Sequence, residues 1–264
     1  MPHTVHSLLY STIKKLEAVK IPSAHLDAEI LLSSALGKPK IFLYTHPEYV
    51  CNATDVHAVE TLLLRRLQKE PIAYIIKEKE FYGRSFFVDK RVLIPRPKTE
   101  EIVDKVLHFI ASNNVTPPCA LIDIGTGSGC IIITLAKELL PLVQKNHIRV
   151  FASDISKDAL DVAKHNATMH SVKKYISFLH GDLLLPFLSL PFTACRSFIV
   201  TANLPYIPPD IYDTLEPEIT TFEPKGALIA PHPNCYYDAL LQQIDDLKAM
   251  THCSVATFFE HYAG

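Results

Sequence analysis

Residues 120–129 read ALIDIGTGSG, and this stretch decides the fold of the chain. Its first half is an apolar run, which is typical of a strand buried on both faces of a sheet. Its second half is rich in glycine, and the apolar residues from Cys130 onward continue as a helix. A strand that turns through glycines into a helix brings unpaired backbone amides to the turn, so the stretch predicts a ligand site there.

Strands and helices alternate on the C-terminal side of this turn. Strand-like apolar runs begin at Ile148, Ile176 and Ser197, and a helix is expected over residues 157–170. This alternation predicts an α/β fold with a doubly wound, mainly parallel sheet. Ligands of such sheets bind at the carboxyl ends of the strands, so functional residues are expected there.

The N-terminal part of the chain has a helical pattern instead. Apolar residues recur at helical spacing within residues 5–19, 25–37 and 57–70, with Gly37 as the expected C-cap of the second helix. The spacing then changes, and EFYGRSFF at residues 80–87 predicts two strands that turn at Gly83. We therefore expect a helical domain at 1–75, a β-hairpin linker at 76–97 and an α/β domain at 98–264.

The composition is that of a globular protein of 264 residues, with 48% hydrophobic and 20% charged residues. The formal net charge of −2 lacks the basic excess typical of nucleic-acid-binding proteins. The cysteines form no CxxC pair and the histidines no HExxH motif, so we expect neither a metal site nor a disulfide framework, and a reducing cytoplasm fits. We also expect no membrane segment, because the apolar runs are far shorter than the ~20 residues of a span.

Acidic residues follow three of the predicted strands. Asp123 ends the first, where a carboxylate suits a cationic ligand and would repel a pyrophosphate; the GxGxG spacing also differs from the GxGxxG of dinucleotide binders. Asp154 ends the second strand, where it either accepts hydrogen bonds from both hydroxyls of a ribose or caps the next helix. Ser156 can provide the helix cap instead. Asp182 follows the third and either bonds an adenine amine or caps a turn. This set favours a sulfonium nucleoside, so we infer S-adenosylmethionine as the cofactor.

The fourth strand runs into NLPYIPPD at residues 203–210. Proline fixes φ and supplies no amide, so the segment leaves the sheet abruptly and keeps a rigid shape. A planar NH2 group is a poor nucleophile, and acceptors that hold its two hydrogens would orient it beside a methyl donor. The Asn203 side-chain oxygen and the Leu204 carbonyl are the predicted acceptors, and Tyr206 is predicted to stack on the flat group.

Taken in order, DIGTGSG, FASD, HGD and NLPY resemble the motifs of class I methyltransferases, which have a Rossmann-like fold. NLPY is similar to the Asn-Pro-Pro-Tyr motif of enzymes that methylate glutamine or adenine amino groups. The stretch FYGRSFFVDKRVLIPRPKTEEIV and the helical N-terminal part narrow the resemblance to the protein-(glutamine-N5) methyltransferases that modify peptide chain release factors. The resemblance extends from about Leu8 to the last residue.

The resemblance implies a role for each part of the chain. The helical domain is expected to recognise the substrate, and the methyl group is expected to pass to the glutamine of a Gly-Gly-Gln loop. The residues expected at the cofactor are Asp123, Gly125, Thr126, Gly127, Ser128, Gly129, Asp154, Asp182 and Asn203. Those expected at the glutamine are Asn203, Leu204, Pro205 and Tyr206, with Arg96 at the approach to the pocket.

The sequence departs from the family pattern at several places. Leu204 stands where the family has proline; Pro205 still keeps residue 204 extended, so we expect its carbonyl to keep its direction and a proline at 204 to be tolerated. After Leu228 the family's Gly-Gly and Asp-Gly-Leu elements are replaced. A fifth strand is expected in ATFFEHYAG at residues 256–264, without the family's final strand hairpin.

Three other functions stay open on these residues alone. Methylation of a ribosomal-protein glutamine would use the same motifs, so only the partner separates it from the first function. Adenine-N6 methylation of nucleic acid agrees with NLPY but not with the near-neutral charge, and no stable nucleic-acid binding is expected. A protein that binds the cofactor without catalysis is the third, suggested by Leu204 and by the short C-terminal part.

Overall fold

The computed structural model of the chain describes residues 3–112, 114–190, 195–232 and 234–260. Its contacts divide the chain into two compact units. A helical unit consists of residues 1–77 together with 216–222, and a sheet unit consists of residues 78–215 and 223–264. The last part of the predicted fifth-strand segment, residues 261–264, lies outside the described residues.

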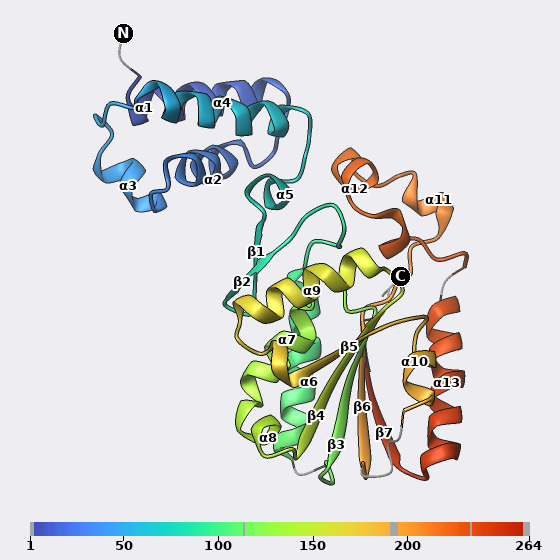
Figure 1. The fold of residues 1–264 in the computed structure, drawn as a ribbon. Coiled ribbons are helices and arrows are strands. Elements are labelled where there is room, and N and C mark those ends of the chain that lie inside the picture. Colours follow the sequence, from blue (N-terminus) through green and yellow to red (C-terminus); the bar gives the residue numbers. More distant parts are fainter. Residues whose placement is uncertain (1–2, 113, 191–194, 233, 261–264) are drawn as a thin grey trace. The chain divides into compact units, whose positions relative to one another are not determined.

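The helical unit is built from three longer helices and several short ones (Figure 1). In chain order these are α1 (Val5–Ala18), α2 (Ala24–Leu36), α3 (Lys40–Thr45), α4 (Ala53–Leu67), α5 (Ile72–Ile76) and the late α12 (Pro217–Phe222). The predicted helices are confirmed, and Gly37 ends α2 in the left-handed conformation with φ of 61°. Helix α4 begins before its predicted start because Asn52 and Asp55 form a reciprocal capping box there.

A buried ion-pair network joins three helices of this unit. Nε of Arg66 on α4 lies 2.6 Å from Oδ2 of Asp27 on α2, and both side chains are less than 5% exposed, at 4% and 3%. Nη1 of Arg66 also lies 2.9 Å from Oε1 of Glu218 on α12. Charges this deeply buried are tolerated only when paired, so Arg66 holds α2 and the late α12 to α4.

The sheet unit opens with the predicted hairpin. Strands β1 (Glu78–Phe81) and β2 (Arg84–Phe87) pair antiparallel and turn through Tyr82 and Gly83, which have φ of 52° and 67°. Two successive positive φ values are typical of the tight turns that match the twist of a hairpin.

The main sheet consists of five parallel strands. They are β3 (Cys119–Ile124), β4 (Ile148–Asp154), β5 (Ile176–His180), β6 (Ser197–Ala202) and β7 (Ser254–Phe259), in the spatial order β5-β4-β3-β6-β7. The chain runs outward from β3 through β4 to β5 and then crosses to β6 on the other side of β3. The Rossmann-like fold class is thereby confirmed, and the change of direction beside β3 is where such sheets bind ligands.

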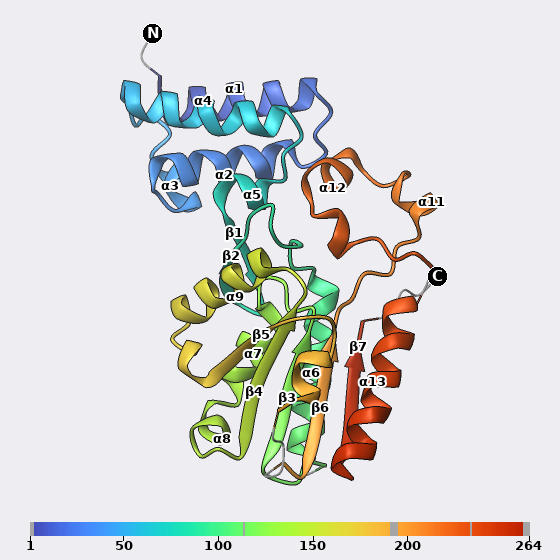
Figure 2. The same ribbon diagram turned by 45° about the vertical axis from the view of Figure 1, so that its right-hand side comes forward.

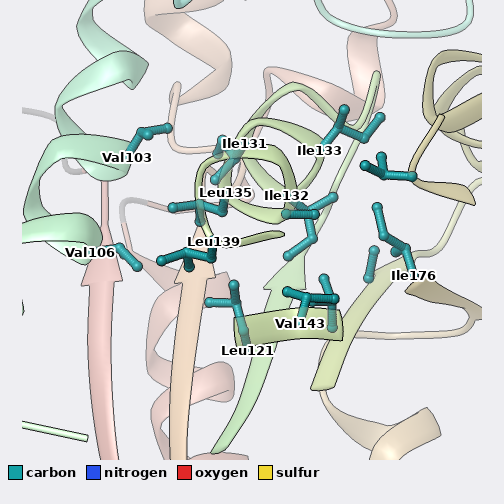
Figure 3. Packing of buried hydrophobic residues seen from close by; sticks show 14 of the residues in the cluster. Val103, Val106, Leu121, Ile131, Ile132, Ile133, Leu135, Leu139, Val143 and Ile176 are labelled. Carbon is teal, nitrogen blue, oxygen red and sulfur yellow. The ribbon is translucent and has the colours of Figure 1, made fainter. Parts of the chain in front are cut away.

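Helices cover both faces of this sheet (Figures 1 and 2). One face carries α6 (Glu100–Ala111), α7 (Cys130–Glu138), α8 (Leu140–Gln144) and α9 (Lys157–Met169), and the other carries α10 (Leu185–Leu188) and α13 (Cys235–Thr251). Successive residues of β3 enter opposite cores: Leu121 packs under α7, as Figure 3 shows, and Ile122 packs toward α13. Short turns complete the unit, namely η1 (Pro97–Thr99), η2 (Lys173–Tyr175), α11 (Pro209–Tyr212) and η3 (Lys225–Ala227).

Among the described residues, no helix combines the length and the apolar character needed to span a membrane.

The Asp27–Arg66 pair generates a stability prediction. Asp27→Ala is expected to lower the free energy of unfolding by about 3 kcal/mol, because it leaves a buried guanidinium without its nearest carboxylate. Urea unfolding followed by circular dichroism measures the change. Glu17→Ala is the matched control, because it breaks the exposed Lys14–Glu17 pair and is expected to change stability little. Equally small effects of the two variants would show that the buried pair contributes no more than a surface pair.

Candidate active site

A cavity of about 370 Å³ lies in the sheet unit at the carboxyl ends of β3, β4 and β6. Its volume is in the range of small-molecule sites. The predicted site residues that line it are Arg96, Gly125, Thr126, Gly127, Ser128, Asp154, Asp182, Asn203, Leu204 and Pro205. Asp123, Gly129 and Tyr206 do not line it. Strands far apart in sequence thus bring most of the predicted residues to one place, as the rule for parallel sheets requires.

The glycine turn forms the floor of this cavity. Gly125 has φ of +65°, and a Cβ added to it would lie 2.9 Å from Cδ2 of Leu204. The positive φ favours glycine at this position, and the missing side chain leaves room for Leu204 in the segment that follows β6. The Thr126 amide donates to the Ser153 carbonyl at 2.9 Å, which fixes the turn to β4.

Asp123 lies beneath the cavity and is 1% exposed. Its Oδ2 accepts a hydrogen bond from the Thr126 hydroxyl and its Oδ1 accepts one from the Thr201 hydroxyl, both at 2.7 Å. Burial raises the pKa of this carboxyl to about 7, and the two hydroxyl donors oppose the shift. Its direct contact with a ligand stays a prediction, since both oxygens already serve to hold the glycine turn and β6 together.

Asp154 lines the cavity from the end of β4. Its Oδ2 accepts from the Gly127 amide and its Oδ1 from the Ser156 amide, each at 2.9 Å. Burial raises the pKa of Asp154, and these amide donors act against the rise. Ser156 caps α9 by accepting from the Ala159 amide at 3.2 Å, so helix capping by a side chain is already provided. Each oxygen of Asp154 retains capacity to accept a further hydrogen bond.

These features fit an uncharged ribose and a cationic centre better than a pyrophosphate. The cavity offers the carboxylate of Asp154 and, at its exposed rim, that of Asp182. Carboxylates accept from hydroxyl or amine groups and repel phosphate. The amide of Gly127, which a phosphate would need, is already used by Asp154. The residues therefore fit S-adenosylmethionine, the cofactor inferred from the sequence.

Asn203 follows β6 and lines the cavity. Its Nδ2 lies 3.3 Å from Oγ1 of Thr99, and the Thr99 hydroxyl donates to Oε2 of Glu260 at 2.6 Å. Thr99 and Glu260 are buried, at 2% and 7% exposure. Within the described residues, the Asn203 side-chain oxygen accepts no hydrogen bond, which leaves it available to a ligand.

Leu204 differs from its sequence-based interpretation. Its amide donates to the Tyr237 hydroxyl at 3.0 Å, and that hydroxyl also contacts the Glu260 carbonyl. Burial raises the pKa of Tyr237, which keeps the hydroxyl protonated and able to donate. The expectation that a proline at 204 would be tolerated is therefore corrected, because the amide that proline lacks has a buried partner.

Arg96 lines the cavity beside η1 and pairs with Glu223. The Glu223 carboxylate accepts from Nη2 of Arg96 and, at 3.2 Å, from the Ile94 amide. The Arg96 side chain is 37% exposed and that of Glu223 only 2%. A buried carboxylate thus fixes a half-exposed guanidinium at the edge of the cavity. Its role toward a substrate stays a prediction.

Sequence reasoning missed several residues that hold the site in place. They are Thr99, Asn166, Glu223, Tyr237 and Glu260. Glu260 follows β7, so the strand-end rule applied to the fifth strand would have found it. Asn166 joins the hairpin to the glycine turn through the carbonyls of Phe87 and Ser128, at 2.9 and 2.8 Å. No sequence pattern marks this asparagine or Tyr237, because their partners are distant in the chain.

Two family models match the chain. The PrmC N-terminal domain matches residues 7–76, and a methyltransferase domain matches residues 116–259. The first match covers the part of the sequence with a helical pattern, and the second covers the part in which strands and helices alternate.

Curated relatives match over most of the chain. The release factor glutamine methyltransferase of Chlorobaculum tepidum is 38% identical over 240 residues, which cover 90% of this chain and 79% of that protein. The release factor glutamine methyltransferase of Leptospira interrogans is 39% identical over 243 residues, covering 92% of this chain and 81% of that protein. Identity of this extent across both units shows the family: the chain is a methyltransferase and belongs to the release factor glutamine methyltransferase family.

Proposed function

We propose that this chain transfers a methyl group from S-adenosylmethionine to the side-chain nitrogen N5 of the glutamine in the Gly-Gly-Gln motif of peptide chain release factors. The proposal rests mainly on Asn203, which lines the cavity and whose side-chain oxygen accepts no hydrogen bond among the described residues. The names of the two relatives, which are 38% and 39% identical to this chain, support the release factor as substrate.

The cofactor side of the site is assigned to the glycine turn and the first strand ends. Asp154 would accept hydrogen bonds from the ribose hydroxyls, with Gly125, Thr126, Gly127 and Ser128 in contact beside it. Asp182 would accept from the adenine amine at the rim. When bound, S-adenosylmethionine supplies an electrophilic methyl group on a sulfonium centre. The hydrogen bond from the Thr126 hydroxyl to Asp123 would hold the turn in place for the cofactor.

The substrate side is assigned to the segment after β6. The Asn203 side-chain oxygen and the Leu204 carbonyl would each accept one hydrogen of the glutamine NH2, which aims the nitrogen and limits its rotation. Pro205 lines the cavity. Tyr206 does not line it and packs on the α13 side of the sheet, so its predicted stacking on the flat amide would need the ring to turn toward the cavity. Arg96 would guide the loop that carries the glutamine.

We assign recognition of the release factor to residues 1–75, as a separate step from chemistry. Large apolar side chains are exposed on this part, including Ile41 at 65%, Tyr44 at 59% and Val50 at 57%. Contiguous exposed apolar groups are typical of protein-binding surfaces, and Ile41 and Tyr44 lie about one turn apart on α3. Because release factors act in translation, we propose a cytoplasmic location for the chain.

A substrate panel tests the proposal directly. The chain is incubated with S-adenosylmethionine labelled in the methyl group and, in separate reactions, with a purified release factor, ribosomal proteins or DNA. Label is expected in the release factor alone and is expected to disappear when the glutamine of its Gly-Gly-Gln motif is replaced. Label only in ribosomal proteins or only in DNA would contradict the proposed substrate, and no label with intact cofactor binding would contradict catalysis.

Asp154→Ala tests the ribose assignment. The variant is expected to bind S-adenosylhomocysteine roughly ten- to a hundredfold more weakly, since charge-assisted hydrogen bonds of about 1.5–3 kcal/mol are lost. Isothermal titration calorimetry gives the affinity. Asp158→Ala removes an exposed carboxylate of α9 that does not line the cavity, and it should bind as the wild type does. Unchanged affinity of Asp154→Ala would leave Asp154 as a purely structural residue.

Asn203→Ala tests the acceptor role. Turnover is expected to fall roughly a hundred- to a thousandfold, because a preorganised polar contact in a water-excluded site contributes about 3–4 kcal/mol to transition-state stabilisation. Single-turnover rates on a release factor measure this, with calorimetry to show that cofactor affinity is nearly unchanged. Asp210→Ala, an exposed change on α11, serves as the control. Wild-type rates for Asn203→Ala would mean that the segment is only a rigid turn.

Tyr237→Phe tests the support of Leu204. In the wild-type background it is expected to lower the free energy of unfolding by about 1–3 kcal/mol, because the buried Leu204 amide loses its acceptor. In a Leu204→Pro background that amide is absent, so the same change should destabilise by about 1 kcal/mol less. Urea unfolding of the four chains completes the cycle. Additive effects would show that Tyr237 does not act through the Leu204 amide.

A further inference from the structure

The hydrogen bonds around Asn203 fix the direction in which its carboxamide faces. An asparagine amide has an accepting oxygen at one side and a donating NH2 at the other, and the two can exchange by a rotation about the last side-chain bond. Only the oxygen can accept a hydrogen from a substrate NH2. An exchanged amide would instead direct its own hydrogens at those of the substrate, so the orientation decides whether the site works.

Thr99 determines which side faces the cavity. A threonine hydroxyl has a single hydrogen, and in Thr99 this hydrogen is donated to Oε2 of Glu260 at 2.6 Å. The Thr99 oxygen can therefore only accept from Asn203, at 3.3 Å from Nδ2. The NH2 of Asn203 is held toward Thr99 and its oxygen is left for the cavity.

Glu260 is itself anchored in the sheet unit. Its backbone amide donates to the carbonyl of Ala202, the residue before Asn203, at 3.1 Å, and its own carbonyl contacts the Tyr237 hydroxyl. A carboxylate can only accept hydrogen bonds, so Thr99 must be the donor in its hydrogen bond with Glu260. The 7% exposure of Glu260 and the 2% exposure of Thr99 limit competition from water.

We propose that Thr99, held by Glu260, is a positioning residue that sets the Asn203 carboxamide so that the active site accepts hydrogens from a planar NH2 group and rejects substrates that offer an acceptor there. This inference rests on the proposed function for its kinetic test, although the orientation of Asn203 is a property of the chain itself. It assigns a role to the threonine of PRPKTE and to the glutamate after β7, neither of which is a predicted site residue.

Thr99→Val and Thr99→Ser form the matched pair that tests this. Valine removes the hydroxyl, and the turnover number on a release factor is expected to fall roughly ten- to a hundredfold, with KM and cofactor affinity changed less than about threefold. Serine keeps the hydroxyl and is expected to stay within about threefold of the wild type. Equal turnover of the valine and serine variants, or an equal loss of cofactor affinity in the valine variant, would overturn the proposal.

A second comparison separates positioning from folding. In an Asn203→Ala background, Thr99→Val is expected to have no further effect on the single-turnover rate, because the group that it orients is absent. Should Thr99→Val fail to fold, Glu260→Gln replaces it, because glutamine can donate to Thr99 as well as accept from it. The single-turnover rate is then expected to fall roughly three- to tenfold when Asn203 is present and to stay unchanged in the Asn203→Ala background. A loss that persists without Asn203 would place the effect in the fold and contradict the proposal.

A readout without substrate distinguishes failure of this inference from failure of the proposed function. The NMR signals of the Asn203 side-chain NH2, assigned by comparison with Asn203→Ala, should coincide in the wild type and Thr99→Ser and shift in Thr99→Val. If the wild type methylates no release factor, these signals still decide the orientation. Signals that are the same in the valine and serine variants would overturn the inference while leaving the methyltransferase assignment intact.

Discussion

The buried carboxylate of Asp123 is the contact on which the geometry of the site depends. It holds the Thr126 hydroxyl of the glycine turn with one oxygen and the Thr201 hydroxyl of β6 with the other, each at 2.7 Å. The turn carries the proposed cofactor contacts, and β6 leads directly to Asn203. One side chain therefore fixes the distance between the two halves of the site, and its full burial makes both hydrogen bonds strong and costly to lose.

A second buried carboxylate, that of Glu260, supports the proposed substrate side of the site. Glu260 contacts Thr99 through its side chain and Tyr237 through its backbone carbonyl, and these residues reach Asn203 and Leu204 in turn. The leucine shows how a departure from a family motif is accommodated. Where the family has proline, this chain has an amide that needs a partner, and the Tyr237 hydroxyl supplies one. The rigidity of the segment thus arises partly from a tertiary hydrogen bond rather than from the proline ring alone.

The fold and the location of the site could be predicted from the sequence because both depend on local pattern. Alternating apolar runs give the sheet, and the proposed ligand residues Asp154 and Asn203 lie where its strands end. The support of those residues could not be predicted in this way. Thr99 and Glu260 are separated by 161 positions, and Asn166 and Phe87 are separated by 79. No local rule relates residues so far apart. The same limit applies to the contact of Asp123 with Thr201, 78 positions away, whereas its other partner, Thr126, is only three positions away.

In the proposed function, two fixed acceptors at the end of β6 select a planar NH2 group for methylation. Tandem mass spectrometry of a release factor treated with this chain and S-adenosylmethionine tests it most directly, because fragmentation locates the added methyl group. We predict a single methyl group on the side-chain nitrogen of the glutamine in the Gly-Gly-Gln motif. A methyl group on a lysine, a carboxylate or the peptide backbone would overturn the proposal, since none of these offers the flat NH2 that the two acceptors are placed to hold.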